Sequence, residues 1–207
     1  MTIEERDYLF DQALALSGIL EQECLELLGM MENIDDRVAI SRAITKLESE
    51  GDDIFHATGA RLQKMELDPE TRIKIFQMIR HVEDVTDMVD ELSKTIVRYN
   101  TRTVTNGFKA SVNSINGAVK KLVVLINAMR EYTPEMKDHF TKTVNTFDAF
   151  KVDYEKMYDV LIFDLFSKPH DVVDIIRCKA IYDAIRDIFE AFEVSADDAY
   201  KYIVSKD

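Results

Sequence analysis

Two neighbouring segments of the chain each carry a Glu-x-x-x-Asp pair. Glu48 and Asp52 lie in KLESEGDDIFH (46–56), and Glu83 and Asp87 lie in HVEDVTDMVDEL (81–92). A spacing of four residues stacks two side chains on one face of an α-helix. Carboxylates that converge from two helices supply hard oxygen donors, which suit iron, manganese, magnesium or calcium. The two pairs therefore predict a metal site, provided that the two helices face each other.

Two further residues extend this prediction. His56 follows Asp52 by four residues and would add a nitrogen donor, which favours iron or zinc. Asp90 lies one turn beyond Asp87 and is a candidate for another oxygen ligand. Glu50 and Asp53 point away from the apolar stripe of their segment and are expected at the solvated surface. The alternative interpretation is an acidic surface without metal, balanced by lysines and arginines.

The elements that must position these residues are helices. Apolar residues recur at helical spacing along nearly the whole chain, and only 6 glycines and 3 prolines are available for tight turns between strands. We predict an all-α protein, with helices over approximately 3–31, 35–64, 69–99, 106–131, 134–166 and 170–205. The connections are short, so neighbouring helices must run antiparallel and form an elongated bundle.

The chain also contains an internal repeat at the level of its apolar stripes. A shift of 103 residues places Ile44 on Phe147 (147 minus 44) and Val89 on Phe192 (192 minus 89), without an insertion. We therefore predict a single domain over 1–207, built from two three-helix repeats over approximately 1–103 and 104–207.

Three stretches of the chain resemble a known family, the PhoU-like phosphate transport regulators, and within it the branch of Pit accessory proteins. They are LESEGDDIFH, HVEDVTDMVDEL and the C-terminal LFSKPHDVVDIIRCKAIYDAIRDIFEAFEVSADDAY. The last contains a K-x-I-Y-(D/E)-A motif, matched by Lys179, Ile181, Tyr182, Asp183 and Ala184. The resemblance implies two pseudo-symmetric three-helix bundles and metal clusters on the acidic motifs. It also implies an accessory or regulatory role beside phosphate transporters, with no established catalytic reaction.

The second half departs from the acidic motif of this family. Adding 103 to the four first-half positions gives Lys151, Glu155, Arg186 and Glu190, so both leading carboxylates are replaced by cations. A lysine or an arginine repels a metal ion and offers it no lone pair. We expect cross-helix ion pairs instead, Lys151 with Glu190 and Arg186 with Glu155.

Charge and hydropathy limit the partners of the protein. The net charge is -13, from 39 acidic and 26 basic side chains, which opposes binding to nucleic acid and favours cations and basic protein surfaces. The cytoplasmic loops of bacterial membrane proteins are rich in lysine and arginine, so a transporter could be docked by complementary charge. No membrane span or signal peptide is recognisable in the sequence. We expect a cytoplasmic protein, held at the inner membrane only through a transporter; a homo-oligomer is left open.

Three functions remain open at this point. The first is an accessory or regulatory protein of an inorganic phosphate transporter, not an enzyme, with one metal ion (iron, zinc, magnesium or calcium) in the first half. The second is a metal-free helical scaffold or interaction protein. The third is a ferritin-like di-iron enzyme, which normally requires Glu-x-x-His on two helices. The nearest approach to that motif is Asp53-x-x-His56. No hydrolase constellation or glycine-rich phosphate loop is recognisable.

Overall fold

The computed structural model describes residues 2–167 and 169–204 and is helical almost throughout. Its helices are α1 (Ile3–Glu32), α2 (Arg37–Leu62), α3 (Pro69–Arg98), α4 (Asn106–Arg130), α5 (Lys137–Ser167) and α6 (Val172–Val204). Single 3-10 turns, Ile34–Asp36 and Pro134–Met136, lead into α2 and α5. No strand occurs in the described part of the chain. The predicted all-α class is confirmed, and the helix ends differ from the expected ones by about a turn or less.

Local sequence signals explain where the helices begin and where the chain reverses. The Asp68 carboxylate accepts a hydrogen bond from the backbone nitrogen of Thr71 at 2.9 Å, and Pro69 occupies the first turn of α3. Thr105 caps α4 in the same way, accepting from the nitrogen of Phe108 at 3.0 Å. Between these helices Asn100 has a φ of 50°, a left-handed conformation that asparagine tolerates better than most residues.

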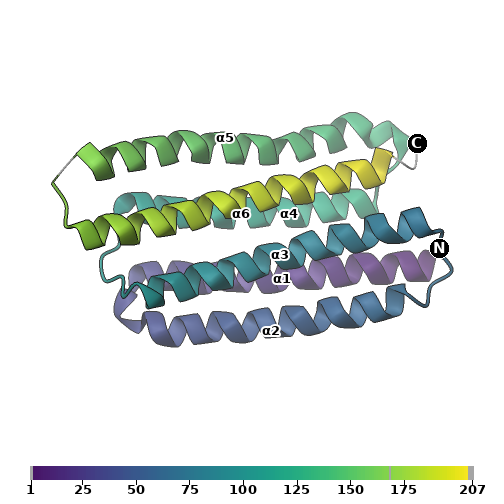
Figure 1. Cartoon of the computed structure of the whole chain (residues 1–207). Helices are drawn as coiled ribbons and strands as arrows, with labels where there is room; N and C mark the ends of the chain where they lie inside the picture. The colour runs from purple at the N-terminus through teal and green to yellow at the C-terminus, as the bar shows by residue number, and fades with distance from the viewer. Residues whose placement is uncertain (1, 168, 205–207) are drawn as a thin grey trace.

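The six helices run along one long axis, as Figure 1 shows. Helices α1 to α3 form one antiparallel three-helix bundle, and α4 to α6 form the second. The bundles join side by side, because α1 packs against α4 and α3 packs against α6. Helices α2 and α5 lie at opposite edges, so each contacts helices of its own half only. The predicted pair of antiparallel three-helix bundles is thus confirmed.

Polar contacts also link the two halves. The Ser195 hydroxyl of α6 donates to the His81 carbonyl of α3 at 3.2 Å, and the Arg177 Nε donates to the Tyr99 carbonyl at 2.7 Å. At the other side of the joint an Arg130 nitrogen donates to the Asp11 carboxylate at 2.8 Å. The apolar core is one cluster that spans both halves. The two bundles therefore form one packed body.

The repeat can be followed in the helices. Helix α3 begins at 69 and α6 at 172, which is an offset of 103 (172 minus 69), and both Val85 and Ile188 at this offset are fully buried. In the first helix of each half the buried positions coincide at an offset of 102, which pairs Leu20 with Leu122 and Leu27 with Met129. An origin by internal duplication stays a prediction.

The hairpin of α5 and α6 ends in an exposed apolar surface. Its end reaches beyond the ends of the other helices (Figure 1). Here Phe163 is 70% exposed, Phe166 60% and Val172 68%. No described helix has the length and apolar content needed to cross a bilayer.

Candidate metal centre

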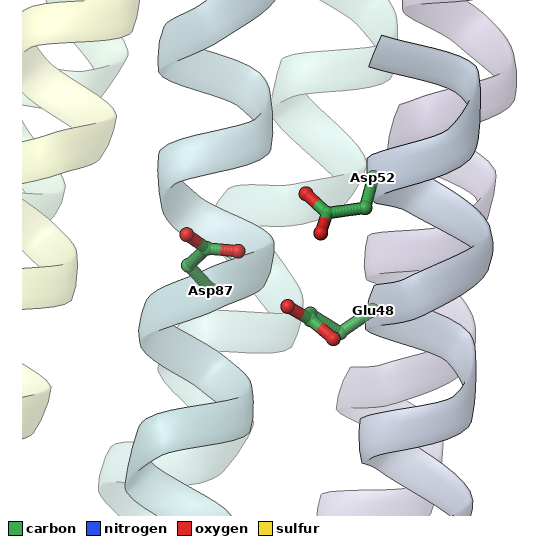
Figure 2. Close-up of side chains that lie close together, drawn as sticks. All are labelled: Glu48, Asp52 and Asp87. Carbon is green, nitrogen blue, oxygen red and sulfur yellow. The ribbon is translucent and has the colours of Figure 1, made fainter. Parts of the chain in front are cut away.

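Three of the four predicted first-half carboxylates meet between α2 and α3. Glu48 and Asp52 extend from one face of α2 toward Asp87 of α3 (Figure 2). One carboxylate oxygen from each residue lies within 4.8 Å of the other two. Glu48 and Asp52 are half-buried and Asp87 is exposed, so the trio is open to solvent on one side. Three oxygen donors at this spacing can bind one cation.

The fourth carboxylate, Glu83, is only 8% exposed and is not one of the three whose oxygens converge. Burial, followed by the charge of Asp87 and a hydrogen bond with Asp52, raises the pKa of Glu83 to about 7. Burial and the charges of Glu48 and Asp52 raise the pKa of Asp87 to about 6. The pKa of Glu48 is raised as well, again mainly through burial. These carboxyl groups thus crowd one another, and each holds its proton more tightly than usual.

Basic side chains do not neutralise this group. Among the described residues, no lysine or arginine forms an ion pair with Glu48, Asp52, Glu83 or Asp87. Lys94, whose charge acts on Glu48, pairs with Asp90 instead. The balanced acidic surface that was the alternative interpretation is seen elsewhere, at the exposed Glu50, which pairs with Lys46 at 3.4 Å. The uncompensated negative charge between α2 and α3 therefore fits a bound cation.

Asp90 and His56, the two additional candidate ligands, do not join the carboxylate trio. Asp90 is 2% exposed and accepts a hydrogen bond from the Thr45 hydroxyl at 2.7 Å, besides its pair with Lys94, so protein groups already use its carboxylate. His56 is exposed, with its ring 5.5 Å from that of Phe55, and lies outside the trio. Each step of four residues turns about 40° around a helix, so the row from Glu48 has rotated away from α3 when it reaches His56.

The donor set is consequently all oxygen. It favours hard cations such as magnesium, calcium, manganese or ferrous iron over zinc. Asp53 is exposed like His56, so the Asp-x-x-His pair does not face the bundle interior. The structural basis for a ferritin-like di-iron site is therefore missing in the described residues.

The sequence reasoning missed Glu23 of α1. This side chain is 0% exposed, and neither of its carboxylate oxygens has a hydrogen-bond partner. Burial, followed by the charges of Asp90, Glu48 and Asp87, raises the pKa of Glu23 to about 9. A signal for it exists in the sequence, because Glu23 continues the apolar stripe of Leu16, Leu20 and Leu27. A glutamate at a core position is rare without a partner.

In the second half, the cations Lys151 and Arg186 do not pair with the carboxylates that the sequence predicted for them. Lys151 does form a cross-helix pair, but with Glu193 at 2.5 Å and not with Glu190. Arg186 places its guanidinium 5.1 Å from the centre of the Tyr158 ring, and its nearest acid is the adjacent Asp187 at 3.6 Å, not Glu155. The long lysine side chain reaches one turn farther along α6 than the repeat suggested, and an aromatic face competes with a carboxylate for arginine.

Comparison with known proteins identifies the fold. The sequence matches no family model and no curated protein. Among solved structures, a crystal structure of a PhoU-like protein from Shewanella oneidensis MR-1 superposes with a TM-score of 0.78 at 16% identity, covering 99% of this chain and 100% of that one. A PhoU-like phosphate regulatory protein from the same organism gives a TM-score of 0.75 at 15% identity, over 98% of this chain and 99% of that one.

These likenesses define the class of structure. The match extends over the full length of both chains, so the chain has the fold of PhoU-like proteins and not merely a bundle of the same size. At these identities the likeness establishes the fold alone.

Proposed function

We propose that this chain is a PhoU-like regulator of phosphate transport, of the Pit accessory branch, and not an enzyme. The observation that carries the proposal is a cluster of carboxylates without basic partners, set between two helices of a full-length PhoU-like fold. One of the similar structures is described as a phosphate regulatory protein, which supports the same role. The K-x-I-Y-(D/E)-A motif at Lys179 to Ala184 supports membership of this family.

The proposed site holds one hard cation on Glu48, Asp52 and Asp87, with Glu83 behind them. Such a cation supplies a positive charge on an otherwise acidic surface, where inorganic phosphate or a partner carboxylate could bind to it. The side chains of the chain itself orient the oxygen donors and leave the side of Asp87 open to solvent.

The proposed partner is an inorganic phosphate transporter at the cytoplasmic face of the inner membrane. Complementary charge supports this choice, since the protein carries a net charge of -13 and cytoplasmic transporter loops are basic. The same charge argues against nucleic acid as a partner.

The metal site is tested by elemental analysis and Mn²⁺ titration of the untagged protein. The double variant Asp52→Asn and Asp87→Asn should lose the metal while staying folded. The matched control is Glu155→Gln with Glu190→Gln, at the equivalent positions of the second half, which should keep it. If the parent binds no iron, manganese, magnesium or calcium, the metal part of the proposal is wrong and a metal-free interaction protein is the better account.

The regulatory role is tested separately, by phosphate uptake in cells that lack this chain. We expect uptake of labelled phosphate to change, and the parent gene but not the Asp52 and Asp87 variant to restore it. Unchanged uptake at both low and high external phosphate would contradict the role in phosphate transport, whether or not metal binds.

A further inference from the structure

Glu23 has no role in the packing of the protein that a leucine would not fulfil better. It belongs to the buried stripe of α1, where it follows Leu16 and Leu20 and precedes Leu27. Neither of its oxygens is hydrogen-bonded within the described part of the chain. A buried carboxyl group without partners lowers the stability of the fold by roughly 1 to 3 kcal/mol when it is neutral. The loss is larger when the group is charged. Its presence in the core therefore needs a cause outside apolar packing.

The surroundings of Glu23 point to the carboxylate trio. The charges that act on it are those of Asp90, Glu48 and Asp87, which come from α2 and α3. Helix α1 packs against both of these helices, and Glu23 lies on its buried face. The oxygens of Glu23 are not among the three that converge within 4.8 Å of one another, so a shared cation would have to draw the Glu23 side chain toward them. Nearby, Gly51 of α2 is buried, and a Cβ there would lie 3.6 Å from Ile19 of α1, which shows how closely the two helices approach.

The second half provides an internal comparison. At the offset of 102 that superposes the buried stripes of α1 and α4, Glu23 corresponds to Leu125 (125 minus 23), which is 1% exposed. This is the same half in which Lys151 and Arg186 replace the leading carboxylates. The half with the acidic site thus has a buried acid on its first helix, and the half without that site has leucine.

We propose that Glu23 is an inner ligand of the first-half metal site, so that three helices and not two bind the cation. This inference rests on the metal site proposed above. The ligand is a hard divalent cation such as Mn²⁺, held by Glu48, Asp52 and Asp87 at the surface and by Glu23 from the interior. A carboxylate from the rigid core would fix the cation between the helices and couple its binding to the packing of α1 against α2 and α3.

The test compares Mn²⁺ affinity by isothermal titration calorimetry in the parent, Glu23→Gln and Glu26→Gln. Glu26 is an exposed residue of the same helix, so its variant loses the same charge away from the site. We expect Glu23→Gln to bind Mn²⁺ at least 10-fold more weakly, as ligand-shell substitutions commonly do, and Glu26→Gln to match the parent. An affinity of Glu23→Gln within twofold of the parent overturns the inference.

A second variant and a crystallographic experiment distinguish the loss of a metal ligand from a loss of folding. Glu23→Leu copies the second half and should remain folded by circular dichroism while losing the same affinity. In crystals soaked with Mn²⁺, the anomalous peak should lie about 2.0 to 2.6 Å from a Glu23 oxygen. A peak bound by α2 and α3 only would refute Glu23 as a ligand and leave the proposed function standing, whereas no Mn²⁺ binding by the parent would remove both.

Discussion

A single buried carboxyl group illustrates how the chemistry of one residue can oppose the stability of the fold. Glu23 is fully buried without a hydrogen-bond partner, in a bundle whose other buried positions are mostly apolar. The acids around it, Glu48 and Asp87, carry raised pKa values because burial and mutual repulsion disfavour their charged forms. At the scale of the residue, the site is therefore destabilising in the absence of a cation.

Replacing this group should stabilise the metal-free protein. We expect Glu23→Leu to raise the free energy of unfolding by roughly 1 to 3 kcal/mol, because it removes a buried polar group and adds apolar packing. Urea unfolding in the presence of a chelator measures this change. With saturating Mn²⁺ the advantage should shrink or reverse, since the parent gains the free energy of ligand binding. A variant less stable than the parent by 1 kcal/mol or more in chelator would contradict this account.

Helices α5 and α6 carry both buried and solvent-exposed aromatic side chains. Inside their hairpin Tyr154 stacks on Phe189, with ring centres 4.8 Å apart, and the Tyr154 hydroxyl donates to the Tyr182 carbonyl at 3.0 Å. At the end of the same hairpin Phe163 and Phe166 are largely exposed. Helical periodicity assigns the buried and the exposed aromatic residues alike to apolar stripes. Only their exposed fractions in the folded protein distinguish them.

Truncation of these aromatic side chains should have very different effects. Phe189→Ala should lower the free energy of unfolding by about 3 to 5 kcal/mol, because Phe189 is 1% exposed and its loss leaves a cavity. Phe163→Ala, which removes the same atoms from an exposed position, should change it by less than about 0.5 kcal/mol. Thermal and urea unfolding of both variants make the comparison. Similar losses for the two would mean that the end of the hairpin is packed in solution.

For the whole molecule, the acidic site links stability to pH. The pKa values of Glu23, Glu83 and Asp87 are raised to about 9, 7 and 6 in the folded protein. Between their unfolded pKa values and these folded ones, the folded state binds more protons than the unfolded state. The free energy of unfolding therefore falls as pH rises from about 5 to 9.

We expect the metal-free protein to lose roughly 3 to 4 kcal/mol of stability between pH 6 and pH 8, with the larger part from Glu23. Melting temperatures across this range with a chelator test the slope. Glu23→Gln should flatten it. With Mn²⁺ present the slope should weaken or change sign, because protons compete with the metal for the same oxygens. A metal-free parent that becomes more stable toward pH 8 would contradict the predicted direction.

Much of the fold and the three residues of the carboxylate trio were predictable from the sequence. Periodicity and capping residues such as Asp68 gave the six helices and their order, since these are local properties of the chain. The pairing of Glu48 with Asp52 followed from a spacing of four residues within one helix. That the two acidic rows face each other was a condition of the predicted site, and the structure meets this condition for Asp87, which lies in the trio.

How residues from different helices meet depends on the packing of the whole core, which local sequence patterns do not specify. Glu23 of α1 is buried where the charges of Glu48 and Asp87 act on it, His56 is exposed outside the trio, and Lys151 pairs with Glu193. Along one helix, geometry follows from the number of residues between two side chains. Between helices, a small rotation or a shift of one turn exchanges one neighbour for another, and the packing of the whole core sets both. The helices and the faces on which the acids lie therefore follow from the sequence, whereas the packing of α2 against α3 brings Glu48, Asp52 and Asp87 together.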